Sequence, residues 1–300
     1  RQMCIRDRYY ATAKAMKDIT YILRIKCPDA YGIVAKVSSS LNDMNIFIMD
    51  SSFFSDPDTK NYFMRLKIFS SEGEIKSSVF SDAFNNACSD LRMEWTLEKE
   101  SKSPNTLIFV SKYGHCLQDL LYKNSINSLR MNLCGIVSNH EDMKSIASNY
   151  SVPFFFIPNN SQIRKEAETQ IEELIRSKKI DLMILARYMQ IFSANFCSKH
   201  SGKVINIHHS FLPSFKGAKP YKQAYEKGVK IMGATAHYIT EELDAGPIIE
   251  QTVERVDHSQ HPDELELIGQ DIESITLTRA VKKHLEGKVF INGKKTVVFD

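Results

Sequence analysis

The sequence has few features of a secreted, membrane-bound or nucleic-acid-binding protein. Its six cysteines form no C-x-x-C pair and no regular framework, so we expect reduced thiols and a cytoplasmic location. No apolar run reaches the length that crosses a bilayer, and no segment has the order of a secretory signal. The formal net charge is only +3, which gives no electrostatic reason to expect nucleic acid or a membrane surface as a partner.

The chain does have the length and composition of a two-domain globular protein. Its 300 residues are too many for one small core, and its hydrophobic share of 43% and charged share of 25% are ordinary. Residues 1–15 do not fit this pattern, because the string from Met3 to Arg8 is similar to translated adapter sequence. We therefore expect residues 1–15 to be a non-native or disordered extension and the natural chain to start at Met16.

Residues 16–100 have the pattern of a small α+β domain. Apolar alternation predicts strands, and apolar spacing of three and four predicts helices, in the ferredoxin-like order βαββαβ. The strands are expected at 21–27, 46–54, 62–69 and 94–98, and the helices at 32–41 and 79–91. Residues 101–104, Ser-Lys-Ser-Pro, are the predicted linker.

Residues 105–300 alternate strand and helix patterns, which predicts a doubly wound, Rossmann-like α/β domain. Strands are expected at 106–110, 133–137 and 182–185, and helices at 115–123, 141–150 and 164–176. Asp263 is the predicted start of a long helix, and residues 289–299 are a predicted hairpin that turns at Asn292-Gly293. Ligands of such sheets bind beyond the carboxyl ends of the strands.

The candidate chemistry lies between Val204 and Gln251. Asn206 and His208 stand two apart in a predicted strand, so their side chains share one face. An amide and an imidazole aimed at one spot could polarise a carbonyl and hold the negative charge that develops on its oxygen. Asp244 precedes Gly246-Pro247 on a predicted loop and is the expected proton acceptor for an attacking water or amine.

The order of these residues resembles a known family. Asn206-x-His208 is followed by Ser210-x-Leu-Pro213, then by His237 and by Leu243-Asp244-x-Gly-Pro247. This set resembles the formyltransferases that use 10-formyltetrahydrofolate. The sequence around it is similar to the formyltetrahydrofolate deformylase branch of these enzymes. The resemblance extends from about Tyr21 to the end of the chain. It implies that residues 105–300 form a formyltransferase-like catalytic domain.

The resemblance implies an activity and a set of site residues. The activity would be hydrolysis of 10-formyltetrahydrofolate to formate and tetrahydrofolate, which balances the one-carbon pool, supplies formate for purine synthesis and needs no cofactor. Asn206, His208 and Asp244 would be catalytic. The implied substrate-binding residues are Met189, Gln190, Ile191, Phe192, His237, Ile239 and Leu243.

The first domain resembles an ACT domain, a small regulatory module of amino-acid and one-carbon metabolism. The resemblance rests on Cys27-Pro-Asp-x-x-Gly-Ile-Val34 at the first strand-to-helix turn. It implies an amino-acid effector such as glycine or methionine near Asp29 and Gly32, and a homo-oligomer. Tyr31 departs from the usual pattern, so the effector preference does not carry over. Subunit pairing alone is an equally good interpretation, since a fold does not fix a function.

The acceptor of the formyl group separates three hypotheses. Transferases that act on a ribonucleotide need a glycine-rich loop to cradle its phosphate, whereas Ser111 to Leu117 holds a single glycine. Water is therefore the favoured acceptor. A transferase with an amine acceptor and a non-catalytic folate or amino-acid sensor stay open as alternatives.

Three further sets of residues invite other interpretations. His208 and His209 are adjacent in a predicted strand and should face opposite sides, so no metal site is predicted and His209 is expected to support or pack. Cys116 is more readily a small buried residue than a nucleophile. The family resemblance implies that His115-Cys116-Leu117 shapes the pocket. Lys216, Lys219 and Arg187 are candidates to pair with the glutamate tail of the substrate.

Overall fold

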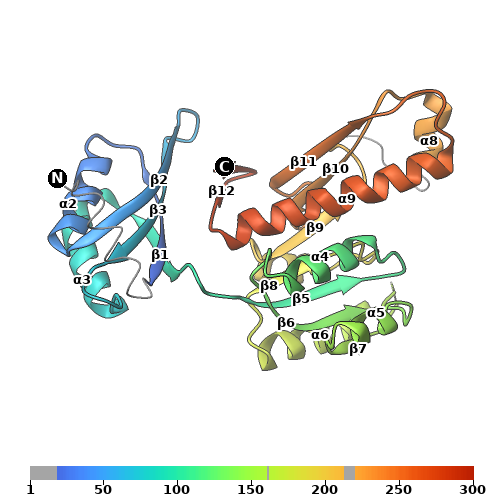
Figure 1. Ribbon diagram of the computed structural model, residues 1–300, viewed down its shortest axis with the longest axis horizontal. Coiled ribbons are helices and arrows are strands. Elements are labelled where there is room, and N and C mark those ends of the chain that lie inside the picture. Colours follow the sequence, from blue (N-terminus) through green and yellow to red (C-terminus); the bar gives the residue numbers. More distant parts are fainter. Residues whose placement is uncertain (1–18, 161, 213–219) are drawn as a thin grey trace, which may run out of the picture. The chain divides into compact units, whose positions relative to one another are not determined.

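The computed structural model describes residues 19–160, 162–212 and 220–300. The expected extension over residues 1–15, Pro213 of the motif, and Lys216 and Lys219 lie outside these ranges. Contacts within the chain divide it into two compact units between Lys102 and Ser103 (Figure 1). In the described residues, no helix combines the length and apolar character needed to span a membrane.

Over residues 19–102, the N-terminal unit is a four-stranded antiparallel sheet in the order β2-β3-β1-β4 with two α-helices. Alternating burial along β1 and apolar spacing along α2 bring their buried residues into one core, which includes Leu23, Val37 and Phe84. The elements are β1 (Thr20–Pro28), α2 (Ile33–Asp43), β2 (Ile46–Asp56), β3 (Asn61–Ser70), α3 (Ser77–Ala87), η1 (Ser89–Leu91) and β4 (Glu94–Lys99).

One helix of this unit is shorter than predicted. The sequence pattern extends a single helix to Leu91, but α3 ends at Ala87 and Leu91 belongs to the separate turn η1. Arg92, which follows, has a left-handed backbone with φ of 46°. The apolar residues thus keep helical spacing as far as Leu91, although the α-helix itself has already ended. Leu91 lies against the core because of packing and not because it belongs to the helix.

The C-terminal unit is built on a seven-stranded mixed sheet in the order β11-β10-β9-β8-β5-β6-β7. Its first five strands in chain order pair in parallel, and β10 pairs antiparallel with both β9 and β11. The strands are β5 (Asn105–Val110), β6 (Asn132–Ser138), β7 (Phe154–Phe156), β8 (Leu182–Leu185), β9 (Val204–His208), β10 (Ile231–Tyr238) and β11 (Ile248–Arg255). The antiparallel edge is a feature that the alternating pattern did not predict.

Helices cover both faces of this sheet. One core cluster joins the sheet to α4, α5 and α9, and a second joins it to α6 and α7. The chain leaves β5 for β6 on one side and returns to β8 on the other, so the strand order reverses at β5 and β8, where such sheets bind ligands. The helices are α4 (His115–Ser125), α5 (Lys144–Asn149), α6 (Arg164–Ser177), α7 (Ala194–Lys199), α8 (Pro220–Lys227) and α9 (Pro262–Leu285).

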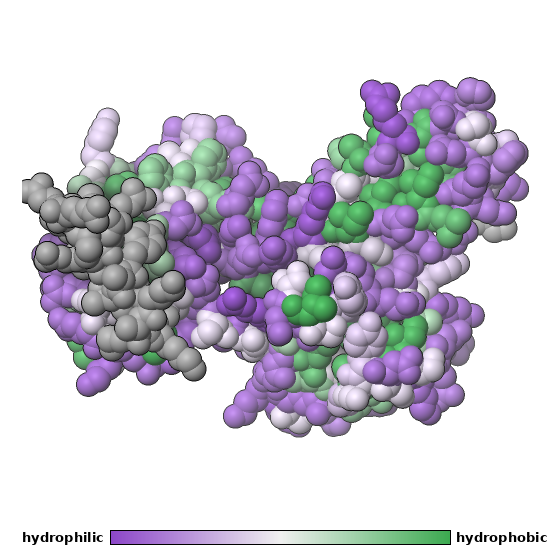
Figure 2. Space-filling model, in the orientation of Figure 1, coloured by the Kyte–Doolittle hydropathy of each residue, from purple (hydrophilic) through white to green (hydrophobic). Residues whose placement is uncertain are grey.

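Helix α9 is the longest and packs against α4, α8 and strands β9 to β11. The prediction that Asp263 starts it is wrong, because Pro262 occupies the first helical position and His261 with Glu264 forms a capping box. Figure 2 shows a mostly hydrophilic face, interrupted by hydrophobic residues where α9 runs in Figure 1. Leu267 and Ile275 of this helix are exposed.

The chain ends with a hairpin of β12 (Val289–Asn292) and β13 (Lys295–Val298). Its turn is one residue later than predicted, because Asn292 pairs with Lys295 across the ladder. Gly293 takes the left-handed position of this turn, with φ of 64°.

Candidate active site

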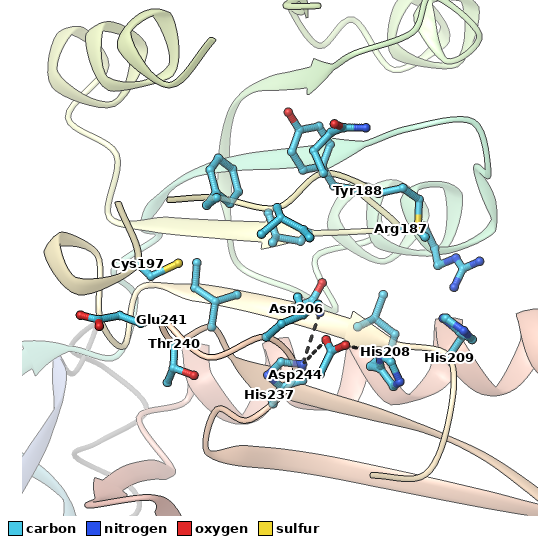
Figure 3. A pocket seen from close by; sticks show the side chains of 18 residues that line it. Arg187, Tyr188, Cys197, Asn206, His208, His209, His237, Thr240, Glu241 and Asp244 are labelled. Atoms are coloured by element: carbon cyan, nitrogen blue, oxygen red, sulfur yellow. Dashed lines mark hydrogen bonds and ion pairs between the residues drawn. The ribbon is translucent and has the colours of Figure 1, made fainter. Parts of the chain in front are cut away.

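A cavity of about 280 Å³ lies at the carboxyl ends of β8 and β9, beside the end of β10. It is lined by the loop after β8, the end of β9 and the loop after β10 (Figure 3). The structure brings together in this lining every predicted catalytic and substrate-binding residue: Asn206, His208, Asp244, Met189, Gln190, Ile191, Phe192, His237, Ile239 and Leu243. The lining also contains Leu185, Tyr188, Thr240 and Glu241, which belong to the two segments that carry the predicted substrate-binding residues. Sequence reasoning missed Cys197 and Ile207, which line it as well.

Asn206 is oriented by the neighbouring strand. It stands opposite His237 in the ladder between β9 and β10, and its amide nitrogen lies 3.3 Å from His237 Nε2. His237 is buried, and its Nδ1 lies 2.9 Å from the carbonyl oxygen of Tyr238. A carbonyl only accepts, so Nδ1 carries the hydrogen and Nε2 is free to accept from the amide. One hydrogen of the Asn206 amide is thereby fixed, and the other is available to a ligand.

Thr235 holds the loop that follows β9. Its buried hydroxyl donates to the carbonyl of Ser210 and accepts from the backbone of Leu212 and the amide of Gln251. Thr235 is therefore a structural residue, and His237 of the same strand is the one that reaches the cavity.

Asp244 faces both histidines. Its carboxylate lies 3.3 Å from His208 Nδ1 and 3.7 Å from His237 Nε2. The hydrogen bond with His208 holds the pKa of the Asp244 carboxyl well below its usual range. The group is therefore a carboxylate at neutral pH.

The backbone conformation of two residues fixes the position of the loop that carries Asp244. Asp244 has φ of 56°, a left-handed conformation that is uncommon without glycine. A Cβ at Gly246 would lie 1.7 Å from the carbonyl oxygen of Tyr238. Only glycine therefore lets this loop lie against the end of β10.

His208 presents one ring nitrogen without a partner. Because the Asp244 carboxylate can only accept, Nδ1 of His208 carries a hydrogen. The other nitrogen, Nε2, is buried and has no hydrogen-bond partner among the described residues. Buried polar atoms are usually paired, so an orphaned nitrogen on a cavity wall indicates a place for a ligand atom.

The prediction that His208 and His209 face opposite sides is wrong. Strand β9 ends at His208, and the two rings stack with their centroids 4.8 Å apart. Both rings line the cavity (Figure 3). Burial, with a smaller contribution from the charge of Arg187, lowers the pKa of His209 to about 4. His209 is therefore a neutral wall of the cavity at pH 7.

The residues of the expected folate wall all line the cavity, but they differ in exposure. Met189, Ile191 and Leu243 are at least half exposed and Ile239 is partly buried, so the four offer apolar surface to a ligand. Phe192 is only 7% exposed and stacks on Phe196 with ring centroids 4.2 Å apart. Phe192 thus belongs mainly to the core beneath the cavity.

Other predicted residues lie elsewhere or have other partners. Asp29 and Gly32 are exposed in the N-terminal unit, at the turn before α2, where Asp29 accepts from the Ser55 hydroxyl and Gly32 has φ of 82°. Arg187 lines the cavity, but its Nε lies 3.4 Å from Glu273. Cys116 is buried, and burial raises the pKa of its thiol, which makes it a poor nucleophile.

His115, Cys116 and Glu273 form the one group in the described ranges whose side chains could together ligate a metal ion, with ligand atoms within 4.8 Å of one another. The Arg187 guanidinium already lies beside the Glu273 carboxylate, so a cation there would meet a like charge. The prediction of no metal site therefore stays a prediction, with this arginine in its favour.

Comparison with known proteins places this geometry in a family. A family model described as "Formyl transferase" matches residues 104–281. The chain is 42% identical over 279 residues to the formyltetrahydrofolate deformylase of Bacillus subtilis, which covers 93% of each chain. It is similar to the crystal structure of a formyltetrahydrofolate deformylase from Burkholderia mallei, with 41% identity, a TM-score of 0.89, and coverage of 94% of this chain and all of the other.

The C-terminal unit also has a second kind of structural relative. The crystal structure of phosphoribosylglycinamide formyltransferase from Anaplasma phagocytophilum is 30% identical, with a TM-score of 0.60. The match covers 66% of this chain and 96% of that one.

Proposed function

Because the chain belongs to the formyltetrahydrofolate deformylase family, we propose that it hydrolyses 10-formyltetrahydrofolate to formate and tetrahydrofolate in the cavity around Asn206, His208 and Asp244. One observation carries the assignment of the site. The Nε2 atom of His208 is buried and unpartnered among the described residues, on a wall that also holds an amide and a carboxylate. The formyl oxygen of the substrate would supply the missing partner.

Asn206 and His208 stabilise the negative charge that forms on this oxygen. His237 fixes the Asn206 amide, which leaves one amide hydrogen for the substrate. When Nε2 of His208 also carries a hydrogen, the Asp244 carboxylate beside Nδ1 offsets the positive charge of the ring. Both donors are held in place before the substrate arrives, and such preorganised donors act most strongly on the transition state.

Asp244 moves the proton. A water molecule attacks the formyl carbon, and its proton becomes acidic as the new C–O bond forms. Asp244 accepts this proton and, because its pKa is low, passes it to the departing N10 nitrogen. The C–N bond then breaks, the oxyanion reforms a carbonyl, and the products are tetrahydrofolate and formic acid, which ionises to formate.

The apolar part of the cavity accommodates the folate. Met189, Ile191, Ile239 and Leu243 present apolar surface on two loops that flank the catalytic groups. Ligand pockets commonly combine such surface with a few polar groups that fix orientation. Gln190 lies between Met189 and Ile191 and is a candidate for reading polar atoms of the pterin.

Residues 19–100 fit an ACT-like regulatory unit. Support comes from their four-stranded antiparallel sheet, their two helices, and the left-handed Gly32 at the start of α2. An amino acid such as glycine or methionine would bind near Asp29 and Gly32. Phe47 and Phe53 are half exposed on β2, an edge strand of this sheet, which favours a homo-oligomer. Formate release with and without each amino acid, and light scattering, test these two points.

The catalytic assignment is tested by following formate and tetrahydrofolate after 10-formyltetrahydrofolate is added to purified protein. His208→Ala and Asp244→Asn should each lose at least about a hundredfold in kcat, because each removes a group that acts on the transition state. His258→Ala is the matched control, since His258 is exposed and outside the cavity. Wild-type rates in the His208 and Asp244 variants would show that the roles assigned here are wrong.

A further inference from the structure

The loop after β8, residues 187–192, forms one wall of the cavity but belongs to no helix or strand. Met189 and Ile191 are at least half exposed, so core packing holds them only in part. Within the described ranges, the Met189 N–H is the one backbone group of residues 189–192 that makes a hydrogen bond. Its acceptor is the hydroxyl oxygen of Ser111, at 3.0 Å. The position of this wall therefore depends on Ser111.

Ser111 contacts this loop at two backbone positions. Its N–H donates to the carbonyl of Arg187 at 3.2 Å, and its hydroxyl accepts from Met189. Arg187, where the chain leaves β8, has φ of 63°, a left-handed conformation that is uncommon without glycine. A residue keeps such a conformation only where its surroundings hold it there. Ser111 supplies two of the contacts that do so, one on each side of Tyr188.

Asn139 orients the Ser111 hydroxyl. Ser111 is only 3% exposed, and its Oγ donates to the side-chain oxygen of Asn139 at 2.7 Å. A serine hydroxyl has a single hydrogen. Because Asn139 accepts this hydrogen, the lone pairs of Oγ are left for the Met189 N–H. Ser111 directly follows β5 and Asn139 directly follows β6, so the ends of two strands that carry no catalytic group determine where the wall begins.

Tyr188, which lies between these two contacts, is fixed by the core. It is 5% exposed, its ring meets the Phe109 ring edge-on at 5.4 Å, and its hydroxyl accepts from the Asn159 amide at 3.1 Å. Figure 3 shows its ring directed away from the catalytic side chains. With Tyr188 fixed, Ser111 is the group that sets the direction in which the backbone continues toward Met189.

We propose that Ser111 is a positioning residue for the folate, which acts through the Met189 backbone and sets where the apolar wall lies relative to the catalytic groups. The proposal rests on the proposed function. Ser111 itself is not part of the cavity lining. Its bond to the Arg187 carbonyl uses a backbone N–H that every residue except proline offers, whereas its bond to Met189 needs the hydroxyl. Loss of the hydroxyl should therefore weaken folate binding equally in the ground state and the transition state, which raises KM and leaves kcat.

The test compares Ser111→Ala with Thr106→Val. Each removes one buried hydroxyl at one end of β5, but Thr106 lies at the end away from the cavity, where its Oγ bonds to the Pro104 carbonyl. The measurements are KM and kcat for 10-formyltetrahydrofolate, Kd for tetrahydrofolate by titration calorimetry, and Tm. Ser111→Ala should raise KM and Kd by about three- to tenfold, as expected for one hydrogen bond, and change kcat by less than about twofold. Thr106→Val should keep the wild-type KM and Kd.

Asn139→Ala covers the case in which Ser111→Ala does not fold. It leaves Ser111 in place but frees its hydroxyl to rotate, so KM and Kd should rise by a smaller factor than in Ser111→Ala. Because Asn139 acts through Ser111, the double variant should match Ser111→Ala alone. A purely structural role would lower Tm and leave KM and Kd unchanged. That result in the folded variants, a fall in kcat at constant KM, or an equal rise of KM in Thr106→Val would overturn the proposal.

Formate release by wild type is recorded separately. If wild type binds tetrahydrofolate but releases no formate, the proposed function is wrong and the Kd values alone decide the role of Ser111. If wild type does not bind tetrahydrofolate, both proposals are overturned.

Discussion

Asp244 and Glu273 are two carboxylates of one unit with similar partners and opposite access to solvent. Each is held by histidine, and the pKa of each is lowered by its neighbours. The Asp244 side chain is 27% exposed and faces a cavity, whereas that of Glu273 is 1% exposed and lies beside His115, Tyr221 and Arg187. A paired carboxylate can move protons only if a reactant reaches it. The same chemistry can therefore take part in a reaction at Asp244 but not at Glu273.

The largest expected effect is a difference in the free energy of unfolding between alanine variants of the two carboxylates. Glu273→Ala leaves His115, Tyr221 and Arg187 without their common partner, and removal of one member of a buried ion pair costs roughly 3–5 kcal/mol. Asp244→Ala should cost less than about 1.5 kcal/mol, because its partners retain access to the cavity. Urea unfolding of the three proteins measures both values. Equal losses of unfolding free energy in the two variants would show that the buried and the solvent-accessible carboxylate do not differ in this respect.

A somewhat smaller effect should appear in turnover. Asn206→Ala removes one donor to the developing oxyanion and should lower kcat by about a hundredfold or more, equivalent to roughly 3 kcal/mol. The Tm should change little, since the amide is only part-buried. The matched control is Asn86→Ala, an exposed asparagine of α3 in the other unit. A large rise in KM at constant kcat would instead indicate that Asn206 binds the ground state.

Gly269 gives a test of how the surroundings of Glu273 are built. Gly269→Ala should destabilise the protein by about 1–3 kcal/mol, because the added methyl group overlaps the Tyr221 ring. In a Tyr221→Ala background the same change should be neutral or stabilising, since alanine favours a helix. Urea unfolding of the four proteins completes a double-mutant cycle. Additive losses would show that Tyr221 does not depend on this glycine.

The smallest effect concerns pH. A carboxyl group whose pKa is lower in the folded than in the unfolded protein stabilises the fold above its unfolded pKa, and this contribution is lost as pH falls through the folded value. Asp244 is such a group. The stability difference between wild type and Asp244→Asn should therefore be larger at pH 7 than at pH 3, as measured by urea unfolding. A constant difference would mean that Asp244 does not titrate differently on unfolding.

The sequence was informative where function and periodicity are local. Strand alternation predicted that Asn206 and His208 share one face, and the family resemblance added the loop carboxylate Asp244. All three line the same cavity. The prediction failed at His209, because β9 ends at His208 and the alternation of side chains between the two faces no longer applies to the next residue. The residues that follow, up to Gln251, gave no sign that β10 and β11 run antiparallel, since pairing direction depends on distant contacts.

Glu273 shows a deeper limit of sequence reasoning. Its partners are 158 and 52 residues away in the chain for His115 and Tyr221, so no spacing reveals them. The one local signal was Gly269, a glycine inside an otherwise regular helix. A glycine in such a position indicates that another group approaches the helix closely, although the sequence does not say which group.

Gly246 has no side chain and takes part in no chemical step, yet its contact with the Tyr238 carbonyl fixes where the loop before it ends. In a saturation library selected for turnover, position 246 should tolerate as few replacements as Asp244. Glu242 should vary freely, since its side chain is exposed and lies outside the lining of the cavity. An investigator who ranked residues by mutational tolerance alone would count this glycine among the reacting groups, although it contributes only by letting the loop pack against the end of β10.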